Sequence, residues 1–380
     1  MARDKLTEHG EENMVYSSTV YHRLTVVLVL FNTTEYNAEY TPTNSLYSDI
    51  SDDVLRTVCI KRINLNVALH SSILITICVG IVCVQIVRRV LPWLYLNIFG
   101  PVLFGPRIDL RRLGAWAVVT GATDGTGKSY AKALAKKGIN VILISRSLSK
   151  LEAVAKELTN AYKVQIKIIE IDFTDGPQIY QTVQKNIEGL DIGVLVNNVT
   201  TSYAHPEFFL EHITQHPKFL RDVISVNIHS VTHMCALILP HMIAKKKGVI
   251  INLSSTAAVI PSPLLSLYGG TKAFVDKFSK DLQTEYQSQG ITVQSVRPDF
   301  LITHMAKLRK TTHLPLSADW YVSSALKTVG IAGQTTGDSL HAIRLLRFQF
   351  LNAIVGNQIV RNIIFNINFC IRIIGLMMRR

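Results

Sequence analysis

Three residues whose types and spacing suit proton transfer lie in the second half of the chain. Tyr268 and Lys272 are four residues apart, on one face of a predicted helix, and Ser255 precedes the tyrosine by thirteen residues. A tyrosine hydroxyl can donate a proton, but its unperturbed pKa is about 10. A neighbouring lysine ammonium stabilises the phenolate and lowers that pKa, and a serine hydroxyl can hold a substrate oxygen. The spacing predicts a carbonyl reduction, in which carbon receives a hydride and oxygen a proton.

The glycines of the segment TGATDGTG, residues 120–127, are placed to bind the phosphates of a dinucleotide. The segment follows an apolar, strand-like run and opens a helical pattern. Such glycines permit a tight turn and let the backbone approach a pyrophosphate, while the helix presents N–H groups and the positive end of its dipole. The cofactor-binding residues predicted here are Gly121, Thr123, Asp124, Gly125 and Gly127.

The end of the second predicted strand indicates which nicotinamide cofactor is used. In an NAD site, an acidic residue about 20 positions past the glycines accepts a hydrogen bond from the ribose 2′-hydroxyl. Here Ser145 is followed by Arg146. A carboxylate would repel a 2′-phosphate, whereas a guanidinium binds one through two hydrogen bonds. Ser145 and Arg146 are therefore predicted to bind NADP(H).

Alternating strand and helix patterns position these residues from Leu113 onward. Continuous Val/Ile-rich runs joined by helices are typical of a parallel sheet covered on both faces, so we expect an α/β fold with a doubly wound, Rossmann-type sheet. The predicted strands are Trp116–Thr120, Asn140–Ile144, Gln165–Ile171, Val194–Asn197, Val249–Leu253 and Thr292–Val296, and the clearest helices are Ser129–Lys137 and Phe274–Tyr286.

An N-terminal segment, Val67–Val87, has the length and composition of a transmembrane helix. Its 21 residues include no Asp, Glu, Lys or Arg, and about 20 apolar residues cross a bilayer core. A buried core helix is the alternative, but one of this length would normally carry a polar stripe. The arginines that follow, among them Arg88 and Arg89, favour a cytosolic catalytic domain.

The chain after Asp338 has no acidic residue and mixes arginines with Ile, Leu, Phe and Met. This composition predicts a segment that lies in the membrane interface. The alternative is a helix packed on the catalytic domain. We expect four parts: a poorly ordered extension (1–60), a transmembrane helix with its juxtamembrane linker (61–112), a Rossmann-type reductase domain (113–343) and a basic apolar tail (344–380).

Composition narrows the possible partners. With 48% hydrophobic and 18% charged residues, the chain is too apolar to be disordered. Its net charge of +13 suits the anionic face of a membrane better than nucleic acid, because the arginines are embedded in apolar sequence. The histidine pairs His229/His233 and His212/His216 lack further ligands, so no metal site is predicted. Five cysteines without C-x-x-C spacing favour a reducing compartment.

The stretch from about Trp116 to Arg344 resembles the short-chain dehydrogenase/reductase family. Finer features, among them VILISRS, LDIGVLVNNV and LYGGTKAFVDKFS, are similar to one branch. That branch holds the membrane-bound 17β-hydroxysteroid dehydrogenases and very-long-chain 3-oxoacyl-CoA reductases of the endoplasmic reticulum. The resemblance rests on Thr120–Gly127, Asp172-Phe173, Asn197-Asn198-Val199, Asn227, Ser255, Tyr268, Lys272, Pro298 and Thr303.

The resemblance implies roles for residues that spacing alone does not explain. Asp172 would face the adenine, Asn198 and Pro298 would lie beside the cofactor, and Thr303 would contact the nicotinamide carboxamide. Asn227 would hold a water of the proton relay, next to the catalytic Ser255, Tyr268 and Lys272. The last two would also contact the cofactor.

The same resemblance implies the setting. The substrate would be a lipophilic ketone, either a long-chain 3-oxoacyl-CoA or a steroid 17-ketone, so the chain would serve fatty acid biosynthesis or steroid metabolism. It would reside in the endoplasmic reticulum membrane with a cytosolic catalytic domain. The helices that bear Asn227 and Tyr268 would form a homodimer face, by analogy alone.

Some positions depart from the family pattern. Thr200 and Asp299 stand where glycines are usual, and the threonine side chain could crowd the cofactor. Thr126 replaces a common isoleucine, and Gly269-Gly270 replaces small side chains inside the predicted tyrosine helix. None of these removes a reacting group, but they leave a second hypothesis open. In it, the chain is a membrane-bound pseudoenzyme that binds cofactor or partners with little or no turnover.

Overall fold

The computed structural model describes residues 52–299 and 317–377. Within these residues the strands form one seven-stranded parallel sheet in the order β3-β2-β1-β4-β5-β6-β7. The predicted doubly wound Rossmann-type fold is confirmed. The strands are β1 (Trp116–Thr120), β2 (Asn140–Ser145), β3 (Ile166–Glu170), β4 (Ile192–Asn197), β5 (Gly248–Leu253), β6 (Ile291–Val296) and β7 (Gln334–Thr335).

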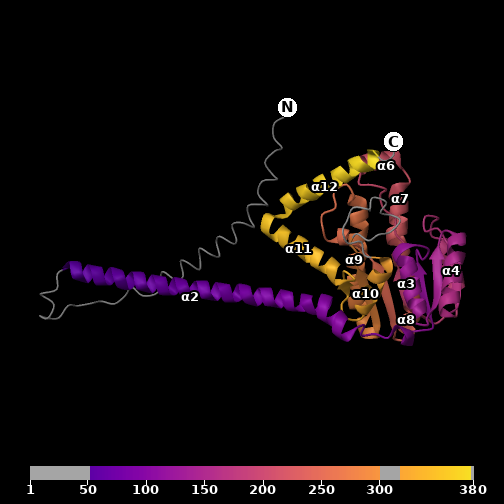
Figure 1. The fold of residues 1–380 in the computed structure, drawn as a ribbon, viewed down its shortest axis with the longest axis horizontal. Helices are drawn as coiled ribbons and strands as arrows, with labels where there is room; N and C mark the ends of the chain where they lie inside the picture. The colour runs from indigo at the N-terminus through magenta and orange to yellow at the C-terminus, as the bar shows by residue number, and fades with distance from the viewer. Residues whose placement is uncertain (1–51, 300–316, 378–380) are drawn as a thin grey trace, which may run out of the picture. The chain divides into compact units, whose positions relative to one another are not determined.

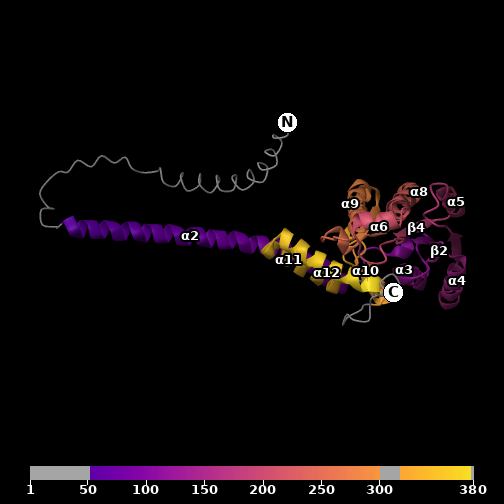
Figure 2. The same cartoon turned by 90° about the horizontal axis from the view of Figure 1, so that it is seen from above.

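Helices cover both faces of the sheet, which explains why its central strands β1, β2, β4 and β5 are mainly apolar rather than alternating. One face carries α3 (Gly125–Lys136), α4 (Leu148–Tyr162) and α10 (Ala318–Lys327). The other carries α5 (Ile179–Ile187), α8 (Ser230–Ala244) and α9 (Ser266–Tyr286), as Figure 2 shows. Two buried apolar clusters result, one including Leu134 and Leu151 and the other including Met234 and Ile238.

Short elements connect these layers. They are α6 (Phe209–Gln215), α7 (Phe219–Ile224), the π-helical η3 (Ser225–His229), and the 3-10 turns η2 (Leu110–Arg112), η4 (Thr256–Ala258) and η5 (Gln287–Gln289). Two of them, η2 and η5, come directly before β1 and β6 at the amino ends of the strands. The strand order reverses at β1, which pairs with both β2 and β4. Ligands of open α/β sheets bind beyond the carboxyl ends of the strands at such a reversal.

An apolar helix precedes the sheet. Helix α2 runs from Asp52 to Leu94 and is followed by the π-helical η1 (Tyr95–Phe104). The predicted segment Val67–Val87 lies inside α2, and its apolar side chains are exposed. Among the described residues, three helical stretches are long and apolar enough to cross a membrane: Ile60–Pro101, Phe219–Ala244 and Asn357–Met377. The second is half buried inside the domain.

Two helices end the described chain. Helix α11 (Ser339–Val355) is joined by Gly356 to α12 (Asn357–Met377), which returns toward α6 (Figure 1). The boundary predicted between residues 343 and 344 falls inside α11. The division into four parts stays a prediction, and most of its first part, residues 1–51, lies outside the described residues.

Candidate active site

The three predicted catalytic residues come together at the ends of β5 and α9. Ser255 follows β5 and caps η4, because its Oγ accepts a hydrogen bond from the Ala257 N–H at 3.1 Å. Tyr268 lies in the first turn of α9 and forms a side-chain hydrogen bond with Ser255. Lys272 lies one turn later, with its Nζ 5.9 Å from the centre of the tyrosine ring. The two hydroxyls can therefore bind one substrate oxygen.

Lys272 is deeply buried. It is 2% exposed, and its Nζ donates a hydrogen bond to the Leu253 carbonyl at 2.8 Å. Burial lowers the pKa of Lys272 to about 7. Burial raises the pKa of Tyr268, and the hydrogen bond with Ser255 opposes that rise. The pKa of Tyr268 is therefore raised, whereas the sequence predicted that it would be lowered. The reason is that desolvation of the phenolate outweighs the hydrogen bond with Ser255.

Asn227 supports the catalytic helix from the side. It lies in the π-helical turn η3, a distortion often found at functional sites. Its amide nitrogen donates to the Thr201 carbonyl and to the Thr271 hydroxyl, at 2.9 and 3.0 Å. Thr271 Oγ1 in turn donates to the Tyr268 carbonyl at 2.8 Å. The asparagine side chain thus ties the start of α9, and with it the tyrosine, to the loop after β4.

Thr200 takes part in the same network. Its hydroxyl donates to the Asn227 amide oxygen at 3.1 Å, and the Thr201 N–H donates to that oxygen at 2.8 Å. The threonine hydroxyl therefore makes a supporting contact at a position where the sequence suggested crowding. With two donated and two accepted bonds, the Asn227 amide has no direction left for a water. Its predicted water contact, if made, would use the backbone carbonyl.

The glycine turn lies between β1 and α3. Gly121 and Gly125 have φ of +64° and +53°, which glycine adopts without strain. A Cβ at Gly127 would stand 2.1 Å from the Gly121 carbonyl oxygen and 2.4 Å from the Asn198 amide nitrogen, so only glycine fits. Asp124 caps α3 through its carboxylate. The first turn of α3 can thus receive a phosphate.

Asn198 holds the turn against β4. Its amide nitrogen donates to the carbonyls of Thr120 and Gly121, at 3.1 and 3.2 Å. The Thr126 hydroxyl donates to the Asn198 amide oxygen at 2.8 Å. The threonine that departs from the family pattern therefore fixes the asparagine predicted to lie beside the cofactor.

Arg146 and Asp172 meet at the ends of β2 and β3. The Arg146 Nη1 lies 3.9 Å from the Asp172 Oδ2, too far for a hydrogen bond, and the arginine side chain is 77% exposed. The Asp172 carboxylate also accepts bonds from Thr174. Nearby, the hydroxyls of Thr123 and Ser145 are 3.1 Å apart. The guanidinium is held at the edge of the site with donors available for an anion.

This donor set fits a 2′-phosphorylated dinucleotide. The N–H groups at the start of α3 suit a pyrophosphate, and an exposed arginine beyond β2 suits a phosphate on the ribose. The turn that would receive the pyrophosphate is kept narrow by the close approach of Gly121, Gly127 and Asn198. The residues present therefore match NADP(H), as the sequence predicted.

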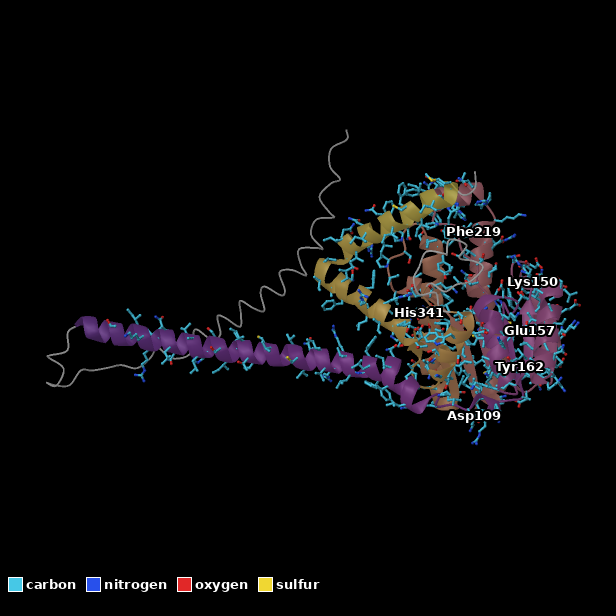
Figure 3. The ribbon with its side chains drawn as sticks, in the orientation of Figure 1. Asp109, Lys150, Glu157, Tyr162, Phe219 and His341 are labelled. Carbon is cyan, nitrogen blue, oxygen red and sulfur yellow. The ribbon has the colours of Figure 1, made fainter. Side chains whose placement is uncertain are left out.

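The loop after β6 begins in the site and is anchored by α11. The Pro298 carbonyl accepts a bond from the Thr256 N–H at 3.0 Å. The Asp299 carboxylate accepts one from Thr256 Oγ1 at 3.2 Å and lies 3.6 Å from Arg344. His341, labelled in Figure 3, is fully buried at the start of α11 and accepts from the Asp299 N–H. Thr303, predicted to contact the nicotinamide, lies outside the described residues.

Two supporting contacts could not be read from sequence. The Leu253 carbonyl binds Lys272, and Thr271 links Asn227 to α9, but neither residue type nor spacing marks these positions.

The histidine pairs pack against aromatic rings: His233 stacks on Tyr180 and His212 contacts Phe219. Among the described residues, no group of three or more potential ligands could hold a metal ion.

Comparisons with known proteins identify the family. A sequence profile of short chain dehydrogenases matches residues 115–313. The very-long-chain 3-oxoacyl-CoA reductase-A of Danio rerio is 52% identical over 232 residues, which cover 61% of this chain and 72% of that protein. The human very-long-chain 3-oxoacyl-CoA reductase is 47% identical over 231 residues, 61% of this chain and 73% of that protein.

Solved structures give the same family. A short-chain dehydrogenase from Sphingobium yanoikuyae in complex with NADPH is 28% identical, with a TM-score of 0.51, and the match covers 56% of this chain and 82% of that one. A 7beta-hydroxysteroid dehydrogenase, 21% identical with a TM-score of 0.61 over 68% of this chain and 99% of that one, shares the fold. With the Ser255–Tyr268–Lys272 site on a seven-stranded parallel sheet, the chain belongs to the short-chain dehydrogenase family of nicotinamide-dependent oxidoreductases.

Proposed function

We propose that the protein reduces long-chain 3-oxoacyl-CoA to the 3-hydroxy product with NADPH. The observation that carries this proposal is that Ser255 and Tyr268 interact beside buried Lys272, in a chain that is 52% identical over 232 residues to a very-long-chain 3-oxoacyl-CoA reductase. No observation in the described residues favours a pseudoenzyme, since every reacting group of the site is present.

Each residue of the site has a defined task in this reaction. Bound NADPH supplies the hydride. The hydroxyls of Ser255 and Tyr268 hold the 3-oxo oxygen, and Tyr268 gives its proton to that oxygen as charge develops there. Lys272, with a pKa of about 7, can carry positive charge beside the resulting phenolate and favour its formation. Asn227 and Thr271 keep the tyrosine in position.

Arg146 would hold the 2′-phosphate that distinguishes NADPH from NADH. The pyrophosphate would lie against the first turn of α3, next to Gly121, Gly125 and Gly127. Asp172, Asn198 and Pro298 would line the remaining cofactor contacts, as the resemblance implies.

The setting is also proposed. The apolar length of Ile60–Pro101 and the lipophilic substrate support an integral protein of the endoplasmic reticulum membrane, with the catalytic domain facing cytosolic NADPH. Homodimer formation through α8 and α9 is supported by Phe274, which is 40% exposed on α9 and stacked on Phe278. A steroid ketone is the alternative substrate.

The test is NADPH oxidation by the full-length protein in detergent micelles, followed by absorbance. We expect turnover with 3-oxoacyl-CoA of long chain and little with steroid 17-ketones or with NADH. Tight NADPH binding without turnover of any ketone would contradict the proposal and favour the pseudoenzyme instead. A preference for steroid ketones would leave the chemistry intact and replace the substrate.

A further inference from the structure

One glycine of the catalytic helix has no packing reason to be a glycine. A Cβ at Gly269 would stand 3.2 Å from Ser262 Cβ and 3.3 Å from the Ala257 carbonyl, so a small residue is required there. At Gly270 an added Cβ would meet nothing within 4 Å. Glycine inside a helix is destabilising relative to alanine. The absence of a side chain at Gly270 leaves space that the protein itself does not fill.

That space belongs to a groove of about 540 Å³. Ligand pockets in proteins typically have about 300–1,000 Å³ and are mainly apolar. Among the described residues, the groove is lined mostly by small and apolar side chains, and none of these lining residues is acidic. Among the lining residues are Ala257, Pro261, Gly269, Gly270, Ala273 and Phe365. Such a lining suits a ligand that needs a dry surface and makes few hydrogen bonds.

The groove begins at the catalytic elements. Ala257 lies in η4, and its N–H is bound by the Ser255 hydroxyl. Gly269 and Gly270 directly follow Tyr268 in α9. The side chains of Ser255 and Tyr268 do not line the groove, and Gly270 lies on the opposite side of α9 from Tyr268. A ligand that reaches both the groove and the reacting oxygen must therefore pass around the first turn of α9.

Helix α12 forms the outer wall and is fixed to the domain by several contacts. Arg372 pairs with Glu207 and, at 2.7 Å, with Glu211, and its guanidinium lies 5.3 Å from the centre of the Phe208 ring. Asn368 donates to the Pro263 carbonyl at 2.8 Å. Phe365, which lines the groove, also packs edge-on against Phe208. The wall is thus attached to the loop that follows Ser255.

The face of α12 that points away from the domain is apolar. Ile359, Ile363, Ile367 and Ile374 are 53%, 45%, 53% and 44% exposed, at spacings that form a stripe along the helix. Exposed isoleucines on a helix of this length suit contact with a lipid surface. The groove therefore lies beneath a helix whose outer side favours contact with lipid, in which a long acyl chain also dissolves.

We propose that this groove binds the hydrocarbon chain of the substrate, with α12 as its wall, a proposal that rests on the function proposed above. Burial of each further CH₂ group strengthens binding roughly fourfold, so a long chain gains affinity that a short one lacks. Arg361 at the rim can line the groove with its methylenes while its guanidinium stays in water. The groove would then select for chain length.

The decisive variant is Gly270→Leu, which places a side chain in the groove and removes a helix-weakening glycine. We expect the ratio of kcat/KM for a long-chain to a short-chain 3-oxoacyl-CoA to fall at least about tenfold, since a change of one methylene in an apolar pocket is worth 10–200-fold. Lys277→Leu, which adds leucine to an exposed position of the same helix away from the groove, should leave the ratio unchanged.

A second measurement does not depend on turnover. A long-chain acyl-CoA with a photoreactive diazirine at the end of its chain should label peptides from residues 257–273 and 357–377 of the full-length protein. Labelling confined to other regions, or an unchanged chain-length ratio in Gly270→Leu, would overturn the groove assignment even if 3-oxoacyl-CoA is reduced. A changed sedimentation coefficient with an unchanged ratio would make the groove a contact between two copies and overturn it too. Labelling of the groove without any reduction of 3-oxoacyl-CoA would support the groove assignment and contradict the proposed function.

Discussion

The tyrosine of the site is held from two directions. Its hydroxyl contacts Ser255, while its carbonyl accepts the bond from Thr271 that leads to Asn227. A tyrosine whose hydroxyl and backbone carbonyl are both bound loses little freedom when substrate binds. This favours proton transfer in a defined geometry.

Replacing Tyr268 with phenylalanine should therefore remove proton transfer and little else. We expect kcat to fall about 10²–10⁴-fold, the usual contribution of a positioned acid, while NADPH affinity measured by fluorescence titration stays within about twofold. Tyr286→Phe, at the other end of α9, is the matched control. Undiminished turnover by Tyr268→Phe would rule out the proposed acid.

Lys272 should make stability depend on pH. Its pKa is about 7 in the folded protein and about 10.4 in an unfolded chain. Between these values the unfolded chain binds more protons, so the free energy of unfolding should rise as pH increases from about 7 to about 10 and should be lowest below pH 7. Lys272→Met should flatten that rise, as measured by Tm without added cofactor at pH 7 and 9.5. An equally steep rise in the variant would assign the slope to other groups.

Arg146 should govern the choice of cofactor. Arg146→Asp removes the phosphate partner and adds repulsion, so KM for NADPH should rise about 10–100-fold, the range expected when a hydrogen bond to a charged group is lost. KM for NADH should change little or improve. Lys150→Asp makes the same change of charge at an exposed residue of α4, labelled in Figure 3, and should leave the preference intact. Wild-type protein that prefers NADH would contradict the assignment outright.

At the level of elements, α12 connects an apolar surface to the active-site loops. Glu207 is 3% exposed. Its burial raises its pKa, but the bonds from Arg372 and the Phe208 N–H outweigh burial, and the pKa of Glu207 is lowered. The pair therefore stays charged at neutral pH. Breaking one partner of such a pair leaves a buried charge without compensation.

Arg372→Gln should loosen α12 without unfolding the sheet. We expect amide hydrogen exchange in residues 357–377 to speed up at least about tenfold, because loss of a partner to a buried charge costs more than 1.4 kcal/mol. Exchange in β1 and β5 should be unchanged. Arg361→Gln, on the same helix but exposed, is the control. Equal protection in both variants would mean that the Asn368 hydrogen bond and the aromatic contacts hold the helix without Arg372.

For the whole molecule, sequence patterns predicted the elements that repeat and missed those that depend on distant contacts. Strands β1 to β6 were predicted because each lies in a short run rich in Val and Ile. Strand β7, Gln334–Thr335, is too short to show a pattern. The docking of α12 was left open because its arginines could equally serve lipid phosphates, and only the fold brings Glu207 and Arg372 together.

The catalytic residues were predictable because Ser255, Tyr268 and Lys272 lie within one short stretch of chain. Asn227 was named only through the family resemblance, and the hydrogen bonds that join it to Thr200 and Thr271 were not predicted, since they link separate segments of the chain. The pKa of Tyr268 was expected in the wrong direction because sequence does not reveal how deeply its surroundings are buried.

Removing residues 1–90 tests the membrane anchor. We expect the full-length protein to stay with membranes after carbonate extraction, since a spanning helix does not dissociate as a surface contact does. The truncated protein should be released, or remain only through a salt-sensitive contact of α11 and α12. A surface sequon engineered into the catalytic domain should remain unglycosylated in cells. Its glycosylation, or solubility of the intact protein, would contradict the proposed topology.

The position of β1 in the sheet sets the order in which the site can assemble during folding. β1, β2 and β3 are consecutive in the chain and form one half of the sheet, which contains the glycine turn and Arg146. The other edge of β1 pairs with β4, which comes later in the chain. The Asn198 N–H, just after β4, donates to the Thr120 hydroxyl at the end of β1. Contacts between distant segments form late because loop closure must come first. A refolding chain should therefore gain affinity for the adenosine end of the cofactor before it gains the ability to reduce anything.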